Sequence, residues 1–146
     1  MIIIIDTNIL ISACLNEKGE IFRMIRNLSG NIDFLIPDYA LEEINKHKLA
    51  VCKNTGYSTF QFDKLLYQCC ENASIFSVAD ISTDIFQQAA DLTRNIDIND
   101  QAFVSFSIAF DALIWTGDLK LMKGLKRSGF RNIISTKEFK DILKGL

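Results

Sequence analysis

The sequence opens with Met1-Ile2-Ile3-Ile4-Ile5-Asp6-Thr7-Asn8, and this stretch decides the fold. An unbroken isoleucine run predicts a strand buried on both faces, because a half-buried strand would alternate apolar with polar residues. Such strands are typical of the interior of a parallel sheet. The strand ends at Asp6, and ligands in open α/β sheets bind at that edge. Since Asp, Thr and Asn are also good helix N-caps, the stretch alone leaves a capping and a chemical role for Asp6 open.

Segments with helix and strand patterns alternate along the rest of the chain. Short apolar runs predict further strands at 34–36, 74–78, 112–116 and 132–135. Helices are predicted in two parts within 9–28, from 38 to about 48, at 58–71, 83–94, 102–110 and 119–127, and from 136 onward, with a turn at 54–56. Strands separated by helices of about ten or more residues indicate βαβ units. The fold class is therefore α/β, with helices on both faces of a parallel sheet.

Composition indicates one ordered globular domain over residues 1–146, with 49% apolar residues, 23% charged residues and one proline. The N-terminal apolar run is too short to span a bilayer and has no basic segment before it, so we expect no membrane association and a cytoplasmic location. A net charge of -2 and a pI of about 5.4 argue against a protein that coats nucleic acid by bulk attraction. They do not exclude an enzyme that acts on nucleic acid.

Most of the common catalytic motifs are absent from the sequence. It has no glycine-rich phosphate loop, no Gly-x-Ser-x-Gly elbow and no pair of metal-ligating histidines. The single histidine, His47, is interpreted as a solvated residue on a helix. The cysteines lack the paired spacing of a zinc site and are interpreted as small buried apolar residues: Cys14, Cys52, Cys69 and Cys70. The carboxylates are therefore the side chains of this sequence that are best suited to catalysis.

Four acids are expected to meet at one edge of the sheet. Asp6 and Asp118 each follow a predicted strand, Asp100 opens a buried helix, and Glu43 lies in the first turns of a helix that follows a strand. Carboxylates gathered in this way repel one another unless a divalent cation neutralises them, and hard oxygen ligands suit Mg²⁺ or Mn²⁺. Such a cation lowers the pKa of a bound water and stabilises the charge that builds on a phosphate during in-line displacement.

Four short motifs carry a resemblance to a known family. They are Ile5-Asp6-Thr7-Asn8, Leu41-Glu42-Glu43-Ile44, Asp97-Ile98-Asn99-Asp100-Gln101-Ala102-Phe103 and Trp115-Thr116-Gly117-Asp118. In this order and spacing they resemble the PIN-domain ribonucleases, which include the toxins of many bacterial toxin–antitoxin pairs. The resemblance covers nearly the whole chain, and its first and last motifs are the most specific. It implies a single PIN-like nuclease domain with a three-layer α/β/α sandwich around a central, mainly parallel sheet.

The resemblance also implies a role for each motif residue. One or two Mg²⁺ or Mn²⁺ ions would be bound by Asp6, Glu43, Asp100 and Asp118. Asn8 and Thr116 would be polar supports that hydrogen-bond the carboxylates and hold them in place.

Two of these assignments leave a choice between neighbouring acids. Glu42 adjoins Glu43, and Asp97 lies close before Asp100. We prefer Glu43 because a branched apolar residue, Ile44, follows it, as is usual in the family. Asp100 is preferred because it directly precedes the buried helix.

Basic residues follow two of the acids and are interpreted as a track for RNA phosphates. Lys46 and Lys48 come after Glu43, whereas Lys120 and Lys123 come after Asp118. RNA would be recognised through unpaired bases more than through duplex grooves. An ordinary solvated helix surface explains these lysines equally well. The resemblance further implies an antitoxin protein as a partner and a homodimer as the default assembly.

The sequence thus predicts a metal-dependent endoribonuclease that hydrolyses RNA phosphodiester bonds, with two alternatives. A non-catalytic PIN-like module would bind RNA or protein, but the full set of acids argues against a degenerate site. A phosphohydrolase of the haloacid-dehalogenase type would need a second aspartate two residues after Asp6, and that position is Asn8.

Overall fold

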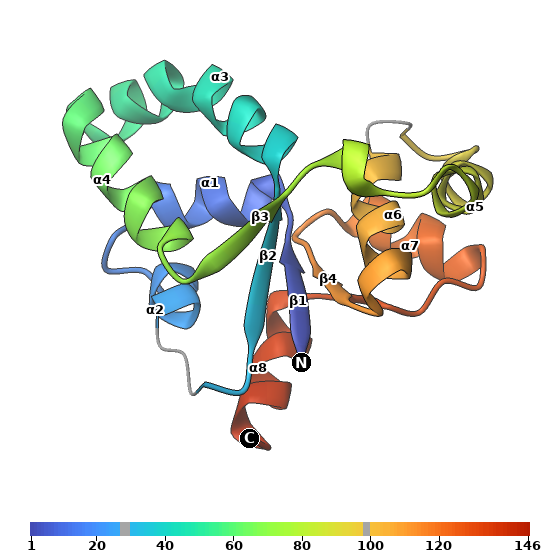
Figure 1. The fold of residues 1–146 in the computed structure, drawn as a ribbon. Coiled ribbons are helices and arrows are strands. Elements are labelled where there is room, and N and C mark those ends of the chain that lie inside the picture. The colour runs from blue at the N-terminus through green and yellow to red at the C-terminus, as the bar shows by residue number, and fades with distance from the viewer. Residues whose placement is uncertain (27–29, 98–99) are drawn as a thin grey trace.

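A parallel sheet forms the centre of the molecule (Figure 1). In the computed structural model, which describes residues 1–26, 30–97 and 100–146, five strands follow the order β3-β2-β1-β4-β5. All neighbouring strands pair in parallel. The isoleucine run is the middle strand, and Ile3, Ile4 and Ile5 are completely buried, as predicted. The strands are β1 (Ile2–Ile5), β2 (Asp33–Pro37), β3 (Ala73–Phe76), β4 (Leu113–Trp115) and β5 (Ile133–Ile134).

Helices flank the sheet on both sides. Figure 1 shows α1 to α4 on one side and α5 to α7 on the other. The helices are α1 (Thr7–Leu15), α2 (Glu20–Arg26), α3 (Asp38–Thr55), α4 (Thr59–Cys70), α5 (Thr83–Thr93), α6 (Gln101–Phe110), α7 (Leu119–Arg127) and α8 (Thr136–Lys144), and a 3-10 turn, η1 (Val78–Asp80), follows β3. This architecture confirms the predicted α/β fold with a central parallel sheet between layers of helices.

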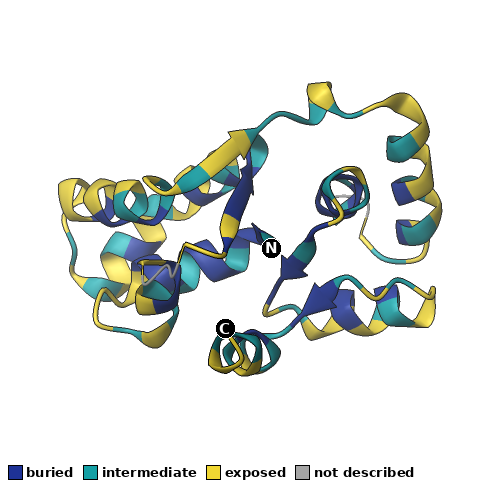
Figure 2. Ribbon diagram, turned by 60° about the horizontal axis from the view of Figure 1, so that its bottom comes forward, coloured by how far each residue is buried: buried dark blue, intermediate teal, exposed yellow. Residues whose placement is uncertain are grey.

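The core fixes the strands against one another. Trp115 of β4 and Phe34 of β2 both pack on Phe139 of α8, with ring centroids 4.6 and 6.1 Å apart, respectively. All three rings are buried, and Figure 2 shows burial concentrated on the inner strands and on the inner faces of the helices, whereas β3 is exposed or half-buried. Large aromatic rings contribute most to such packing, so strands on both sides of β1 are held in register and their carboxyl ends form one edge.

The third helix is longer than the sequence pattern predicted. We expected it to end near Lys48 and a turn to follow at 54–56, but α3 continues to Thr55. No proline or glycine interrupts it before Gly56, and Val51 on its inner face is buried, so packing carries the helix on. Gly56 then adopts a φ of 78°, the left-handed conformation that commonly ends helices.

The other boundaries agree with the predictions to within a few residues. Pro37 is the last residue of β2 and pairs with Phe76 of β3. β3 ends earlier than expected because Val78 begins the 3-10 turn. The helices predicted within 9–28 correspond to α1 and α2, and positions 27–28 of that prediction lie outside the described residues.

The cysteine prediction is confirmed in part. Cys14 and Cys69 are buried, whereas Cys52 and Cys70 are half-buried, and none of them forms a disulfide. Among the helices of the described part of the chain, none is both long and apolar enough to cross a membrane.

Candidate active site

Asp6 lies at the carboxyl end of β1, and its side chain is held by one residue of α1 and one residue that follows β4. Only 5% of the residue is exposed. Its Oδ2 accepts hydrogen bonds from Thr116 Oγ1 at 2.5 Å and from Asn8 Nδ2 at 2.9 Å. Although Asp6 occupies the N-cap position of α1, its side chain makes no capping bond there. The hydrogen bond from Thr116 therefore connects Asp6 across the sheet edge to the segment that follows β4.

Asn8 and Thr116 connect this carboxylate to the start of α7. The Gly117 backbone N–H donates to Asn8 Oδ1 at 3.0 Å, and the Asp118 N–H donates to Thr116 Oγ1 at 3.0 Å. Asp118 in turn caps α7, because its Oδ1 accepts from the Leu121 N–H at 3.0 Å. The first and last sequence motifs thus form one hydrogen-bonded unit, joined by the bonds of Thr116 to Asp6 and of Gly117 to Asn8.

The predicted acids are close enough to repel one another. Burial, followed by the charges of Asp6, Asp97, Asp118 and Glu43, raises the pKa of Asp100 to about 7. Burial also raises the pKa of Asp6, a rise that the Thr116 hydrogen bond opposes and that Asp118 and Glu43 increase. The structure therefore brings together the acids that the sequence singled out, from β1, α3, the start of α6 and the start of α7.

Orientation distinguishes the two neighbouring glutamates. Glu43 is half-buried and its charge raises the pKa of Asp6, whereas Glu42 is exposed on α3. Asp97 is exposed, but its charge also acts on Asp100. Glu43 therefore belongs to the acid cluster, and Asp97 lies at its margin beside Asp100.

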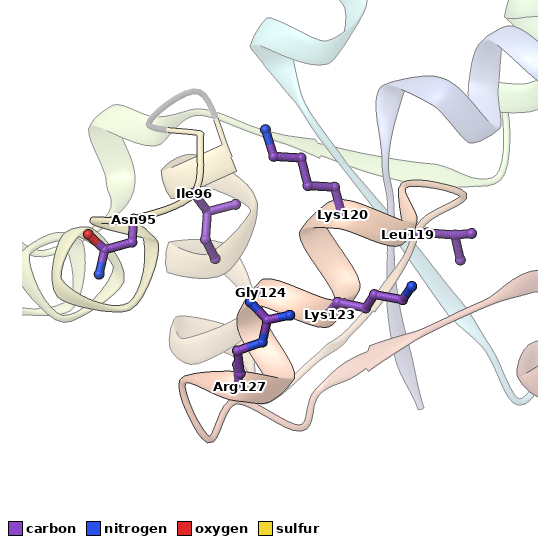
Figure 3. Close-up of a pocket in the computed structure, with 7 residues that line it drawn as sticks. All are labelled: Asn95, Ile96, Leu119, Lys120, Lys123, Gly124 and Arg127. Carbon is purple, nitrogen blue, oxygen red and sulfur yellow. The ribbon is translucent and has the colours of Figure 1, made fainter.

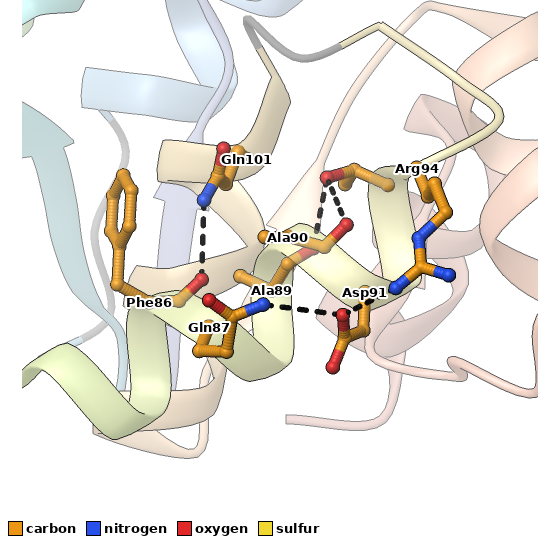
Figure 4. A network of polar contacts seen from close by, with 8 residues as sticks. Phe86, Gln87, Ala89, Ala90, Asp91, Arg94 and Gln101 are labelled. Atoms are coloured by element: carbon orange, nitrogen blue, oxygen red, sulfur yellow. Dashed lines mark hydrogen bonds and ion pairs between the residues drawn. The ribbon is translucent and has the colours of Figure 1, made fainter.

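Asp100 is positioned by a contact between two helices. The next residue, Gln101 in the first turn of α6, donates from Nε2 to the Phe86 carbonyl of α5 at 3.2 Å (Figure 4). Thr93 ends α5 with a hydrogen bond from Oγ1 to the Ala89 carbonyl at 2.8 Å. The Gln101 bond attaches the start of α6 to α5 and so helps to fix the backbone that carries Asp100.

Tyr39 borders the acid cluster and was not among the predicted site residues. Its ring meets Phe103 of α6 edge-on, with centroids 5.3 Å apart. Burial and the charges of Glu43, Asp6, Asp100 and Asp97 raise its pKa far above the ordinary value, so the phenol stays protonated. The available sequence signal was its position just after the end of a strand, near Glu43.

The predicted basic residues fall into different environments. Lys46 is exposed on α3, as is His47. Lys48 is bound instead to α4, because its Nζ lies 2.6 Å from Asp63 Oδ1 and 6.0 Å from the centre of the Phe62 ring. Lys120 and Lys123 of α7 line a pocket next to the acid cluster.

The hydrogen bonds of Thr116 are expected to stabilise the folded protein. Thr116→Val should lower the free energy of unfolding by about 1–3 kcal/mol, because Asp6 loses a donor and the Asp118 N–H loses an acceptor in a buried place. Thermal unfolding followed by circular dichroism should show a Tm lower by roughly 2–4 °C for each kcal/mol. Thr59→Val, at an exposed position of α4, is the matched control. Equal Tm values for the two variants would contradict the prediction.

Comparison with known proteins identifies relatives by family and by fold. A family model described as a PIN domain matches residues 4–138. The structure of VapBC2 from Rickettsia felis bound to a DNA fragment from their promoter has a TM-score of 0.66 and 19% identity, covering 92% of this chain and 97% of that one. The structure of VapBC-1 from nontypeable Haemophilus influenzae has a TM-score of 0.63 and 17% identity, covering 92% and 98%. No curated protein matches.

Proposed function

The chain belongs to the PIN-domain family, and from this premise we propose that it is a metal-dependent endoribonuclease that hydrolyses phosphodiester bonds in RNA. The observation that supports the proposal best is the acid cluster at the carboxyl ends of β1 and β4. Burial and neighbouring carboxylates raise the pKa of Asp100 to about 7, so the site holds more negative charge than it can stabilise alone. Sites of this kind are common where chemistry is done.

The donor set of the cluster fits Mg²⁺ or Mn²⁺. Within the described residues, no three His, Cys, Asp or Glu side chains are arranged as a ready-made metal cage. Mg²⁺ does not need one, since it is usually bound by one or two carboxylates and keeps several waters. When bound, the cation would lower the pKa of a water and offset charge on the phosphate. The proposed ligands, for one or two ions, are Asp6, Glu43, Asp100 and Asp118.

The remaining groups of the site hold the acidic side chains in position. Asn8 and Thr116 hold the Asp6 carboxylate in one orientation, so that its Oδ2 is fixed by two donors. The half-buried Tyr39 ring, which packs edge-on against Phe103 of α6, borders the acid cluster. A preorganised site of this kind lowers the barrier because its groups need not reorganise during the reaction.

For the substrate we propose RNA, attracted by Lys46 of α3 and by Lys120 and Lys123 of α7. Lys48 is a weaker candidate, because its ion pair with Asp63 already holds its ammonium group against α4. We further propose that the chain is the toxin of a toxin–antitoxin pair, binds an antitoxin protein, forms a homodimer and works in the cytoplasm. Family membership supports these partners.

Purified protein incubated with labelled RNA tests the proposal. We expect cleavage with Mg²⁺ or Mn²⁺, none with excess EDTA, and recovery when Mg²⁺ exceeds the chelator, since the cation would lower the pKa of the attacking water and offset the charge on the phosphate. Product gels that map 5′ and 3′ ends distinguish internal cleavage from trimming. Equal cleavage with and without EDTA would contradict metal dependence. RNA binding without cleavage in any arm would indicate a non-catalytic PIN-like module.

A further inference from the structure

A pocket of about 370 Å³ lies between α7 and the segment that follows α5. One wall is the face of α7 that carries Lys120, Lys123 and Arg127, and the other carries Asn95 and Ile96 (Figure 3). The four predicted acids are not among its lining residues. The pocket is therefore a separate feature from the acid cluster, although the two share α7.

The pocket has an unneutralised positive charge. Residues three and seven positions apart on a helix share a face, so the three cations of α7 lie along one wall. Among residues 1–26, 30–97 and 100–146, no acid forms an ion pair with any of them, whereas Lys126, on another face of α7, lies 3.6 Å from Glu138. Like charges held side by side favour an anionic ligand, and guanidinium and ammonium groups are the usual partners of phosphate.

The pocket also has an apolar part. Ile96 lies close against α7 at Gly124, where an added Cβ would be only 2.9 Å from Ile96 Cδ1. Leu119, at the other end of the pocket, is 63% exposed. The Asn95 amide at the rim has both a donor and an acceptor. Cations, an apolar surface and an amide together match the phosphate, the flat faces and the edge of a nucleotide.

The pocket adjoins the acids along one helix. Asp118 is the N-cap of α7, and Leu119 and Lys120 follow it directly. At 1.5 Å of rise per residue, Arg127 lies roughly 13 Å from Asp118 along the helix. A strand whose phosphate is at the acid cluster could therefore reach the pocket with an adjoining nucleotide.

We propose that this pocket binds one unpaired nucleotide of the RNA next to the bond that is cleaved. Lys123 and Arg127 contact its phosphate, and Ile96 contacts its base. A base can enter only when it is free to leave a helical stack, so the pocket selects single-stranded RNA over duplex. This proposal rests on the proposed function and adds a recognition site to it.

The binding of a fluorescent single-stranded oligoribonucleotide in EDTA tests the pocket without cleavage. Lys123→Ala/Arg127→Ala should weaken binding by at least about tenfold and lower the slope of log K against log salt by about 0.7, since the one phosphate that both side chains contact is no longer neutralised. Both side chains are exposed, so the fold should be unaffected. The matched control, Lys18→Ala/Lys64→Ala, removes two exposed cations outside the pocket and should change affinity less than about twofold.

The affinity for a duplex of the same sequence distinguishes binding in the pocket from general electrostatic attraction to RNA. The pocket variant should lose much less affinity for duplex than for the single strand. Equal losses on both RNAs, equal losses in the control pair, or no loss at all would overturn the proposal. A cleavage assay with Mg²⁺ separates it from the proposed function: if the wild type cleaves while the pocket variant binds as tightly, only the pocket proposal fails. If binding is lost as expected but the wild type never cleaves, the endoribonuclease proposal fails and the pocket stands.

Discussion

Asp6→Asn is expected to lower kcat/KM for RNA cleavage in Mg²⁺ by at least about a thousandfold, because a proposed metal ligand loses its charge and several kcal/mol of transition-state stabilisation go with it. The amide has nearly the shape of the carboxylate and can still accept from Thr116 Oγ1 and Asn8 Nδ2. The loss should therefore be chemical, without a change of fold. Initial rates on a labelled oligoribonucleotide measure it.

The Tm of Asp6→Asn shows whether a loss of activity comes from a loss of folding. Burial raises the pKa of Asp6, so its charge opposes folding, and Asp6→Asn should leave Tm unchanged or higher. Asp33→Asn is the matched control, because Asp33 is exposed at the amino end of the neighbouring strand β2, on the opposite edge of the sheet. Its cleavage rate should equal that of the wild type. Asp6→Asn cleaving within about tenfold of the wild type would argue against a catalytic role for Asp6.

The centre of the fold was predictable from the sequence because its signals were local. Ile2 to Ile5 could only be a strand buried on both faces, and the structure has it in the middle of the parallel sheet. The helix over 119–127 was predicted with its correct ends, since Asp118 caps it and Ser128-Gly129 closes it. The end of α3 was missed because the burial of Val51, a tertiary effect, continues the helix beyond Lys48.

The site was predictable only at the level of strand ends. Parallel strands bring their carboxyl ends to one edge, so a meeting of Asp6 with the segment around Thr116 could be expected from the order of elements alone. The sequence could not specify that Thr116 Oγ1 donates to Asp6 while accepting from the Asp118 N–H. Such pairings depend on how two strand ends are staggered.

Side-chain direction on helices was the other limit. Glu42 and Glu43 are adjacent, and only the orientation of α3 turns the second toward the acids. Lys48 shows the same limit, because its position near Glu43 suggested a phosphate contact whereas the packing of α3 on α4 brings it to Asp63. Periodicity alone does not say which neighbour a helix face meets.

Without a metal, the protein should lose stability as pH rises from about 5 to about 8. The pKa of Asp100 is raised from 3.8 to about 7, mainly by burial and then by Asp6, so between these two pH values the folded state holds a proton that the unfolded state has released. Stability from such a group is complete below the unfolded pKa and is lost as pH passes the folded pKa. The full shift corresponds to about 4 kcal/mol, and solvent screening of this partly exposed carboxylate reduces the effect to about 2–3 kcal/mol, or roughly 5–10 °C in Tm. Asp6 acts with the same sign.

Thermal unfolding in EDTA between pH 5 and 8 measures this loss of stability. Repeating the measurement with Mg²⁺ tests whether a bound cation restores it. At pH 8, a cation that binds only the folded state should raise Tm in proportion to the logarithm of its concentration, whereas at pH 5 protons compete with it and the rise should be smaller. Asp100→Asn removes the main titrating group, so its Tm should depend on pH far less than that of the wild type. Glu138 does not contribute to the change in Tm between pH 5 and 8, because hydrogen bonds from Ser135 lower its pKa and its titration lies at more acid pH. A wild-type Tm that rises between pH 5 and 8 in EDTA would contradict the burial and mutual repulsion of these acids. It would also remove the electrostatic reason for the site to bind a cation.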